Sequence, residues 1–476
     1  MRSKQIYIAL PYCSSCQALI VAVLLVGIYV PVLIFTSERF FLIAAFALAG
    51  IILTAEPLFR LLLLVGFLPF VHKGIASGLG GFGIYDIYDA IFIVLFGARI
   101  LFIDLLQWKK VPVLGWTVIM AAAFVPSLIN AQQFLPALKA MVQLIASVLT
   151  TVGIFYYLSE KERIRYVPLI LKLMALEAAF IGALAVYQSR SESILGLVSG
   201  RVYFAGLGDV NYYATYLVVS LALALGIAFS GRRWYQRLLF LVASAIISSA
   251  IVATVSRSAI LTLLVVTFGY AIYFGMYKWR SGKFAGVLSV AVLVSVFAVL
   301  FFTNLGKRVV DLFSLSQRVE TVVVGRDVSI AQRQKIAEVS FRAVAKNPLI
   351  GVGLGNFESS FDVYKGSFLS TGSARSAHNT AIRILAETGV VGFIPSLIFV
   401  FSLILYLLRG IRIAPTASDN ALLFGLFAGL ASFFLMSLTL DQLYEPQFWV
   451  MVGIALAVAK HYREVGQTLI QGKGSK

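Results

Sequence analysis

Residues 209–230 read DVNYYATYLVVSLALALGIAFS, an apolar run opened by a short polar segment. A helix needs roughly 20 mostly apolar residues to cross the hydrocarbon core of a bilayer. Hydrocarbon offers no water to backbone N–H and C=O groups, so a crossing segment must bond them internally as a helix. The stretch therefore predicts a transmembrane α-helix.

Comparable apolar runs recur along the chain. Its 476 residues are 60% hydrophobic and only 13% charged, and the mean hydropathy is +0.93, so most of the chain must lie in lipid. Besides 209–230, the candidate spans are 17–36, 40–55, 58–71, 87–104, 111–129, 136–158, 167–187, 236–255, 258–277, 285–303, 389–408, 421–440 and 446–461. The runs at 40–55 and 58–71 are short, so either a re-entrant pair or a poorly spanning hairpin is open. We predict an all-α, polytopic integral membrane protein with about 12–14 transmembrane helices.

Positive charge is concentrated in alternate loops of this predicted topology. The net charge of +18 would suit a nucleic-acid partner, but in a membrane protein it reflects the Lys and Arg excess of cytoplasmic loops. The basic loops and ends carry Arg2, Lys4, Lys109, Lys110, Lys161, Arg163, Arg165, Arg232, Arg233, Arg237, Lys278, Arg280, Lys283, Arg409, Arg412, Lys460, Arg463, Lys473 and Lys476. The pattern predicts that both termini are cytoplasmic, and no nucleic-acid partner is expected.

The expected organisation has three parts. Residues 1–303 hold the N-terminal transmembrane helices, 304–380 form one large periplasmic loop, and 381–476 hold the C-terminal transmembrane helices and a cytoplasmic tail. Long loops on a rigid scaffold often carry function.

Within the long loop, residues 329–346 (SIAQRQKIAEVSFRAVAK) predict an amphipathic helix. Ser329 is the expected N-cap, and Asn347 with Pro348 ends the helix. The expected apolar face comprises Ile330, Ile336, Val339 and Ala343. The segment GVGLGNF at 351–357 lacks the strand and helix of a dinucleotide fingerprint, so we interpret it as a tight turn at the membrane surface.

Arginines dominate the ionisable groups on the predicted outer side. The candidates among them are Arg201, Arg257, Arg333 and Arg342. The guanidinium group holds phosphate through a planar fork of donors and stays charged, so converging arginines favour a diphosphate ligand. Snorkelling to lipid phosphates, or pairing with a carboxylate such as Asp209, are the alternatives.

Only two of the three histidines, His72 and His378, fall on the predicted outer side. His378 stands where the long loop re-enters a helix, with Asn379 next to it and Glu387 nine residues later. An imidazole can take a proton from an attacking hydroxyl at neutral pH, although a lone interfacial histidine is also commonly structural.

Metal and redox motifs are not recognisable in the sequence. The outer loops show no D-x-D pair, H-x-x-x-H motif or carboxylate cluster. Cys13 and Cys16 form a lone C-x-x-C, which we interpret as two small residues opening the first span. Neither a metal nor another cofactor is expected.

Four blocks taken together resemble a known family. They are GDVNYYA at 208–214, TVSRSA at 254–259, RQKIAEVSFRAVAKNPLIGVGLGNF at 333–357 and HNTAIRILAETGVVG at 378–392. In this order and on this side of the membrane they resemble the O-antigen ligase and O-antigen polymerase superfamily of bacterial envelope glycosyltransferases. The resemblance covers about 200–392; residues before 190 match only in being helical.

The resemblance implies an inner-membrane transferase that moves a glycan from undecaprenyl diphosphate to an acceptor hydroxyl at the periplasmic face, without metal or nucleotide sugar. It implies that Arg201, Arg257 and Arg333 hold the diphosphate and that His378 activates the acceptor. Asp209, Asn211, Asn379 and Glu387 are expected to support them. A single base opposite the leaving diphosphate would invert the anomeric carbon.

Three kinds of acceptor, and one alternative of a different class, stay open at this point. The acceptor can be a lipid A-core or other envelope lipid or glycan, as for a ligase; a second lipid-linked glycan, as for a polymerase; or a protein. A transporter of lipid-linked glycan or polysaccharide would also have many helices, and Lys172 and Glu177 in the seventh span are its best support.

Overall fold

The computed structural model describes residues 57–70, 84–99, 111–160, 162–188, 209–231, 233–278, 328–365 and 376–474. In these residues every regular element is a helix. The elements are α3 (Pro57–Gly66), η1 (Leu68–Phe70), α4 (Ile84–Arg99), α5 (Pro112–Phe124), η4 (Val125–Asn130), α6 (Phe134–Leu158), η5 (Ile164–Tyr166), α7 (Val167–Gln188), α8 (Val210–Ser230), α9 (Trp234–Ala253), α10 (Arg257–Lys278), α14 (Val328–Lys346), α15 (Phe357–Tyr364), α16 (Thr380–Ile413), α17 (Ala417–Ser437) and α18 (Pro446–Gly474). The predicted all-α fold class is confirmed. Of the predicted spans, 17–36, 40–55 and 285–303 lie outside the described residues.

Seven helical segments among the described residues are long and apolar enough to cross a membrane. They are Pro112–Asn130, Phe134–Leu158, Ile164–Tyr187, Val210–Ser230, Trp234–Ala253, Thr380–Ile413 and Ala417–Ser437. Large apolar side chains on the outside of the bundle, such as Ile129, Phe268 and Phe401, are mostly exposed. Lipid is the solvent that such a surface requires, so the polytopic membrane architecture is confirmed.

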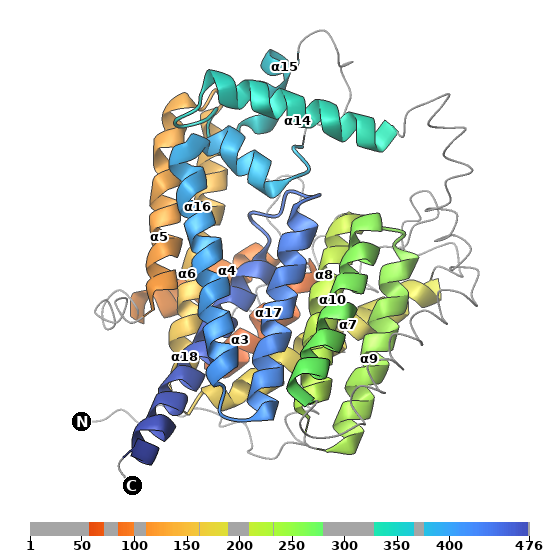
Figure 1. Ribbon diagram of the computed structural model, residues 1–476. Helices are drawn as coiled ribbons and strands as arrows, with labels where there is room; N and C mark the ends of the chain where they lie inside the picture. Colours follow the sequence, from red (N-terminus) through yellow and green to blue (C-terminus); the bar gives the residue numbers. More distant parts are fainter. Residues whose placement is uncertain are drawn as a thin grey trace.

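Helix α8 lies at the centre of the bundle and packs against α7, α9 and α17 (Figure 1). The closest approach joins Gly226 of α8 to Gly425 of α17: a Cβ added to Gly425 would stand 2.9 Å from the Gly226 Cα. The Tyr270 hydroxyl of α10 covers this contact and donates to the Ala222 carbonyl at 2.6 Å. Small residues let transmembrane helices approach closely and gain van der Waals contact, so these glycines set the distance between α8 and α17.

Helix α16 is broken at Gly389, whose φ of 60° and ψ of −165° are not helical. The predicted span 389–408 therefore begins at the break, and Thr380–Thr388 form a separate helical segment. At the break, the N–H groups of Val390 and Val391 donate to the carbonyls of Pro348 and Leu349 at 2.9 and 3.1 Å. The Gly-rich turn of the long loop thus satisfies the backbone groups that the kink releases.

The predicted loop helix is confirmed as α14, which crosses the end of the bundle above α5 and α16 in Figure 1. Ile336, Val339 and Ala343 are buried as predicted, and the first two pack with Phe357 and Phe361 of α15 and Ala386 of α16 in a small separate core. The prediction that Ser329 is the N-cap is wrong, because α14 already includes Val328. Ser329 lies in the first turn, where serine is also tolerated.

Replacing Gly425 with valine should separate α8 from α17. The added side chain would meet the Gly226 backbone, and overpacking of this kind costs about 1–3 kcal/mol. We expect purified Gly425→Val to lose its monodisperse chromatographic peak at a lower temperature than the wild type. Gly269→Val in α10 is the matched control, since a Cβ there meets nothing within 4 Å; equal loss in both variants would contradict the close packing.

Candidate active site

His378 lies at the entry to α16, at the end of the bundle where α14 crosses. Its backbone N–H donates to the Asp441 carboxylate (Oδ2, 3.2 Å). The hydroxyl of Ser376 donates to the same oxygen. Asp441 follows α17, so its carboxylate ties the end of the long loop to the α17–α18 connection.

His378 and Val255 have positive φ angles, 49° and 55°, and no other non-glycine residue in the described ranges does. The left-handed region is unfavourable for residues with a Cβ, most of all for a β-branched one. Such strain tends to occur at functional sites, where the surrounding contacts enforce it. Val255 stands two residues before Arg257, so both strained residues fall in the motifs that carry the predicted site.

The start of α8 connects these two motifs. Asp209 caps the helix by accepting from the Asn211 N–H at 2.7 Å, and the Asn211 side-chain oxygen accepts from the Ser256 hydroxyl at 3.0 Å. Tyr212, the next residue, donates its hydroxyl to the Asp441 carbonyl at 2.8 Å. The structure therefore gathers Asp209, Asn211, the Arg257 turn and the Asp441–His378 pair at one end of the bundle.

The three predicted diphosphate ligands have different positions. Arg257 is the first residue of α10 and is half-buried, and Arg333 is exposed on α14. Arg201 lies outside the described residues, as does His72. Arg342 is ion-paired with Glu338 on the outer face of α14, so it belongs to a solvated helix surface.

Burial and the neighbouring charges together lower the pKa of the His378 imidazole. Partial burial lowers the pKa of His378 below its usual value, and the positive charge of Arg333 lowers it further. The carboxylates of Asp441 and Asp209 act in the opposite direction and raise the pKa of His378. The net shift is downward, so the ring holds a free lone pair at neutral pH and can accept a proton.

Asn379 and Glu387 have supporting positions of different kinds. The Asn379 side chain caps α16 by accepting from the Ile382 N–H at 3.0 Å, and it donates to the Leu438 carbonyl at 3.0 Å. Glu387 is fully buried and accepts from the Gly355 and Phe357 N–H groups at 2.9 and 3.2 Å. Asn379 therefore orients the entry to α16, whereas Glu387 holds the Gly-rich turn.

Asp441 and Arg383 were missed as site residues by sequence reasoning. Arg383 is ion-paired with Glu387 (Nε to Oε1, 3.1 Å) and stands 3.9 Å from the Asp441 carboxylate. Asp441 was visible only as the first residue of the short outer segment DQLYE at 441–445. Asp441 and the candidate base His378 both fall on the predicted outer side. An acidic residue on the same side as the base was the signal that could have identified Asp441.

Two cavities adjoin this end of the bundle. The larger, which we call the polar cavity, has a volume of about 630 Å³ and is lined partly by apolar side chains such as Ile93, Val142 and Leu149. Its polar lining comprises the carboxylates of Asp86, Asp89, Asp441 and Glu445, the cations Lys139 and Arg383, and the rings of Tyr85, Tyr212 and Tyr444. The smaller, of about 250 Å³, is lined almost entirely by apolar side chains of α16, α17 and α18, with Thr380 and Gln442 at its His378 end. In the described part of the chain no group of three His, Cys, Asp or Glu side chains is placed to hold a metal ion.

The fold is that of a polytopic membrane protein, and polar and charged side chains gather with His378 at one end of its helical bundle. Residues 242–397 match the model of a family described as O-Antigen ligase. This match confirms the predicted resemblance to the O-antigen ligase and polymerase superfamily, and it supports glycosyltransferase activity of that general type on lipid-linked glycan and acceptor substrates. It contains Arg257, Arg333 and His378, whereas the GDVNYYA block precedes it. No curated protein matches the chain significantly.

The charges around His378 predict opposite effects of two substitutions on its pKa. In a His72→Gln, His461→Gln background, diethyl pyrocarbonate modifies only His378, and only its neutral ring. The midpoint of modification should lie below pH 6.5, the ordinary value. Arg333→Gln removes a positive charge and should raise the midpoint, while Asp441→Asn should lower it. Shifts in the same direction for both variants would contradict the assigned electrostatics.

Removing the charge of Glu387 should release the Gly-rich turn. Glu387→Gln leaves Arg383 partly unpaired in a buried setting, and breaking a buried pair costs about 3–5 kcal/mol. We expect faster chymotrypsin cleavage at Phe357 and a lower unfolding temperature. The control is Glu358→Gln, which changes an exposed neighbour. Equal resistance of the turn to chymotrypsin in both variants would contradict the role of Glu387 in holding the turn.

Proposed function

We propose that the protein is an inverting, metal-independent glycosyltransferase of the bacterial inner membrane. It transfers a glycan from an undecaprenyl-diphosphate donor to an acceptor hydroxyl at the periplasmic face, as an O-antigen ligase-like enzyme. The carrying observation is His378: its backbone is strained and donates its N–H to Asp441, and its half-buried imidazole has a pKa lowered mainly by burial. In this proposed orientation, with the active end at the periplasmic face, both termini are cytoplasmic.

In the proposed reaction, the neutral ring of His378 removes the proton from the acceptor hydroxyl. The acceptor oxygen forms a bond to the anomeric carbon while the bond from that carbon to the diphosphate oxygen breaks. Arg257, Arg333 and Arg201 stabilise the negative charge that develops on the leaving diphosphate. Attack opposite the leaving group inverts the anomeric carbon, and the diphosphate ester itself supplies the driving force.

The two cavities match the two chemically different parts of the donor. The apolar cavity beside Thr380 suits a polyprenyl chain, which needs apolar walls open to lipid. The polar cavity has hydrogen-bonding carboxylates and tyrosine rings, which suit hydroxyl-rich sugars. Its carboxylates outnumber its cations and would repel a diphosphate, so we assign the sugars to this cavity and the diphosphate to the arginines.

The alternatives differ in how much support they have. A polymerase would use the same catalytic end with a second lipid-linked glycan as acceptor, and the same His378, Arg257 and Arg333 would serve either acceptor. The transporter alternative rested on Lys172 and Glu177. Glu177 is fully buried and accepts from the Tyr216 hydroxyl at 3.1 Å, which favours a structural role. Lys172 lines a different cavity, together with Ser230 at the end of α8 that is opposite Asp209.

The decisive experiment is glycan transfer by purified protein in detergent, with an undecaprenyl-diphosphate glycan as donor, lipid and glycan acceptors, and EDTA present. We expect His378→Ala to lower the rate by about 100-fold or more, as for removal of a general base. Arg257→Ala should lower it by about 10²–10³-fold through loss of charge stabilisation. The product linkage, read by NMR, should be inverted relative to the donor.

The matched control is Arg342→Ala, which removes an outer arginine of α14 that pairs with Glu338 at the surface and should leave transfer nearly unchanged. The acceptor that is consumed distinguishes ligase from polymerase. Full activity of His378→Ala would remove the proposed base, and inhibition by EDTA would contradict the metal-free mechanism. Donor movement across proteoliposomes without any product would favour the transporter.

A further inference from the structure

A cavity of about 510 Å³ lies at the opposite end of the bundle from His378. Helices α8 and α17 connect the two regions: α8 runs from Asp209 at the site to Ser230 at this cavity, and α17 runs back from Ser418 towards Asp441. A helix of this length spans about 30 Å, the thickness of the bilayer hydrocarbon. The cavity therefore lies at the second membrane–water boundary.

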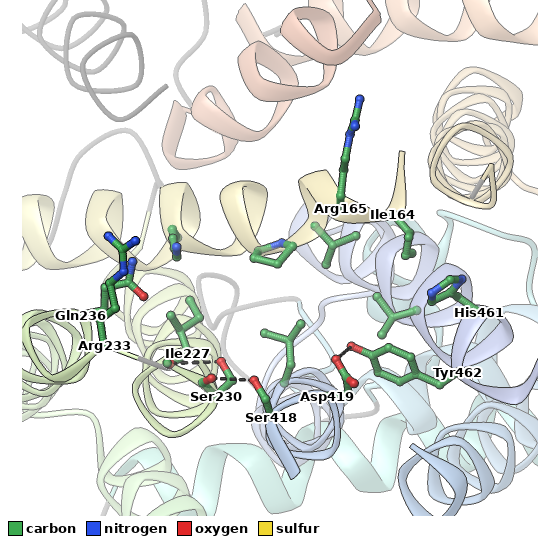
Figure 2. Close-up of a pocket in the computed structure, with 16 residues that line it drawn as sticks. Ile164, Arg165, Ile227, Ser230, Arg233, Gln236, Ser418, Asp419, His461 and Tyr462 are labelled. Atoms are coloured by element: carbon green, nitrogen blue, oxygen red, sulfur yellow. Dashed lines mark hydrogen bonds between the residues drawn. The ribbon is translucent and has the colours of Figure 1, made fainter. Parts of the chain in front are cut away.

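The walls of this cavity are amphipathic. Val167, Ile227, Leu422 and Val458 provide an apolar side. The Ser418 hydroxyl donates to the Ser230 carbonyl at 2.6 Å and thereby joins α17 to α8 across the floor. Figure 2 shows Arg233 and Gln236 on one side of the cavity and His461 with Tyr462 on the other.

The charge of the lining is predominantly positive. Arg165, Lys172 and Arg233 are cationic, and Asp419 is the one carboxylate in the lining. The Asp419 carboxylate accepts from the Tyr462 hydroxyl at 3.1 Å and from Thr416 at 2.7 Å, so it is already engaged. A cavity with several cations, one engaged carboxylate and apolar walls favours an anion that carries an apolar part.

Helix α9 adds a second anion-favouring feature. It begins at Trp234, and its N-cap residue Arg233 makes no side-chain cap. The first N–H groups of a helix and its dipole favour negative charge. Trp234 and Tyr235 next to it are exposed, at 75% and 46%, and aromatic residues of this kind sit at the headgroup level of a bilayer.

We propose that this cavity binds the phosphate group of an anionic phospholipid. The phosphate lies between Arg233, Lys172 and the start of α9, and the first part of the acyl chains lies along Ile227 and Leu422. The lipid joins α7, α8, α9 and α17 at the end opposite the reaction. Basic pockets between transmembrane helices are known to select anionic headgroups by this charge pattern.

The test is native mass spectrometry of the full chain released from mixed micelles with equal phosphatidylglycerol and phosphatidylethanolamine. The wild type should retain phosphatidylglycerol preferentially. The Lys172→Gln, Arg233→Gln double variant should retain it about tenfold more weakly, and Lys172→Arg, Arg233→Lys should restore retention because the charges return. The matched control is Arg409→Gln, Arg412→Gln, which removes two exposed arginines outside the cavity lining and should behave as the wild type.

Three outcomes would overturn the proposal. The first is unchanged retention in the glutamine double variant, and the second is equal loss in the Arg409, Arg412 control. The third is displacement of the lipid by millimolar inorganic phosphate, which would identify a soluble phosphate compound as the ligand. Because retention is measured without transfer, the result is independent of the proposed glycosyltransferase activity.

Discussion

The active end depends on an interlock between the kink of α16 and the Gly-rich turn of the long loop. Each segment has a glycine packed against the backbone of the other. A Cβ on Gly351 would stand 2.3 Å from the Glu387 carbonyl carbon, and a Cβ on Gly389 would stand 2.3 Å from the Leu349 carbonyl carbon. Both residues have positive φ, so glycine is required twice, for space and for backbone conformation. The buried Glu387 carboxylate then accepts from two N–H groups of the turn and from Arg383. This interlock fixes where the segment Thr380–Thr388 points, and with it the position of His378.

Strain at the site is sustained by contacts from several helices. An unfavourable φ costs on the order of 1–3 kcal/mol per residue, so Val255 and His378 need compensating interactions. Val255 lies in a turn held by the Thr254 hydroxyl, which accepts from the Ser256 N–H at 3.2 Å, and by Asn211, which accepts from the Ser256 hydroxyl. His378 is held through Asp441 and the α16 cap at Asn379. The start of α8 contacts both turns, through Asn211 to Ser256 and through Tyr212 to Asp441. These contacts fix the position of one strained residue relative to the other. A rigid placement of arginine and imidazole is what electrostatic stabilisation of a leaving group requires.

The sequence predicted what depends on local pattern and missed what depends on contacts between distant residues. Apolar runs gave the described spans, and the buried face of α14 followed from its periodicity. The break at Gly389 coincided with the predicted start of a span, but its partner, the turn at 348–356, could not be inferred because the pairing joins segments more than 30 residues apart. Asp441 was missed for the same reason, since its role follows from its contact with His378, 63 positions earlier. Ser329 shows the reverse error: a good capping residue predicted a helix start that the structure places before it.

Charge divides the proposed active end into two regions with different substrates. Carboxylates outnumber cations around the polar cavity, whereas Arg257 follows the Ser256–Asn211 contact at the start of α8 and the charge of Arg333 acts on His378. A diphosphate would be drawn to the arginines and excluded from the carboxylates, while neutral sugar hydroxyls can donate to those carboxylates without a charge penalty. The diphosphate and the sugars of the donor would therefore be oriented by charge, before any contact specific to the sugar sequence. Acceptor choice would then depend on the shape of the outer loops around His378, which the catalytic groups do not determine. A ligase and a polymerase can accordingly share one arrangement of histidine and arginines and differ only in the walls around it.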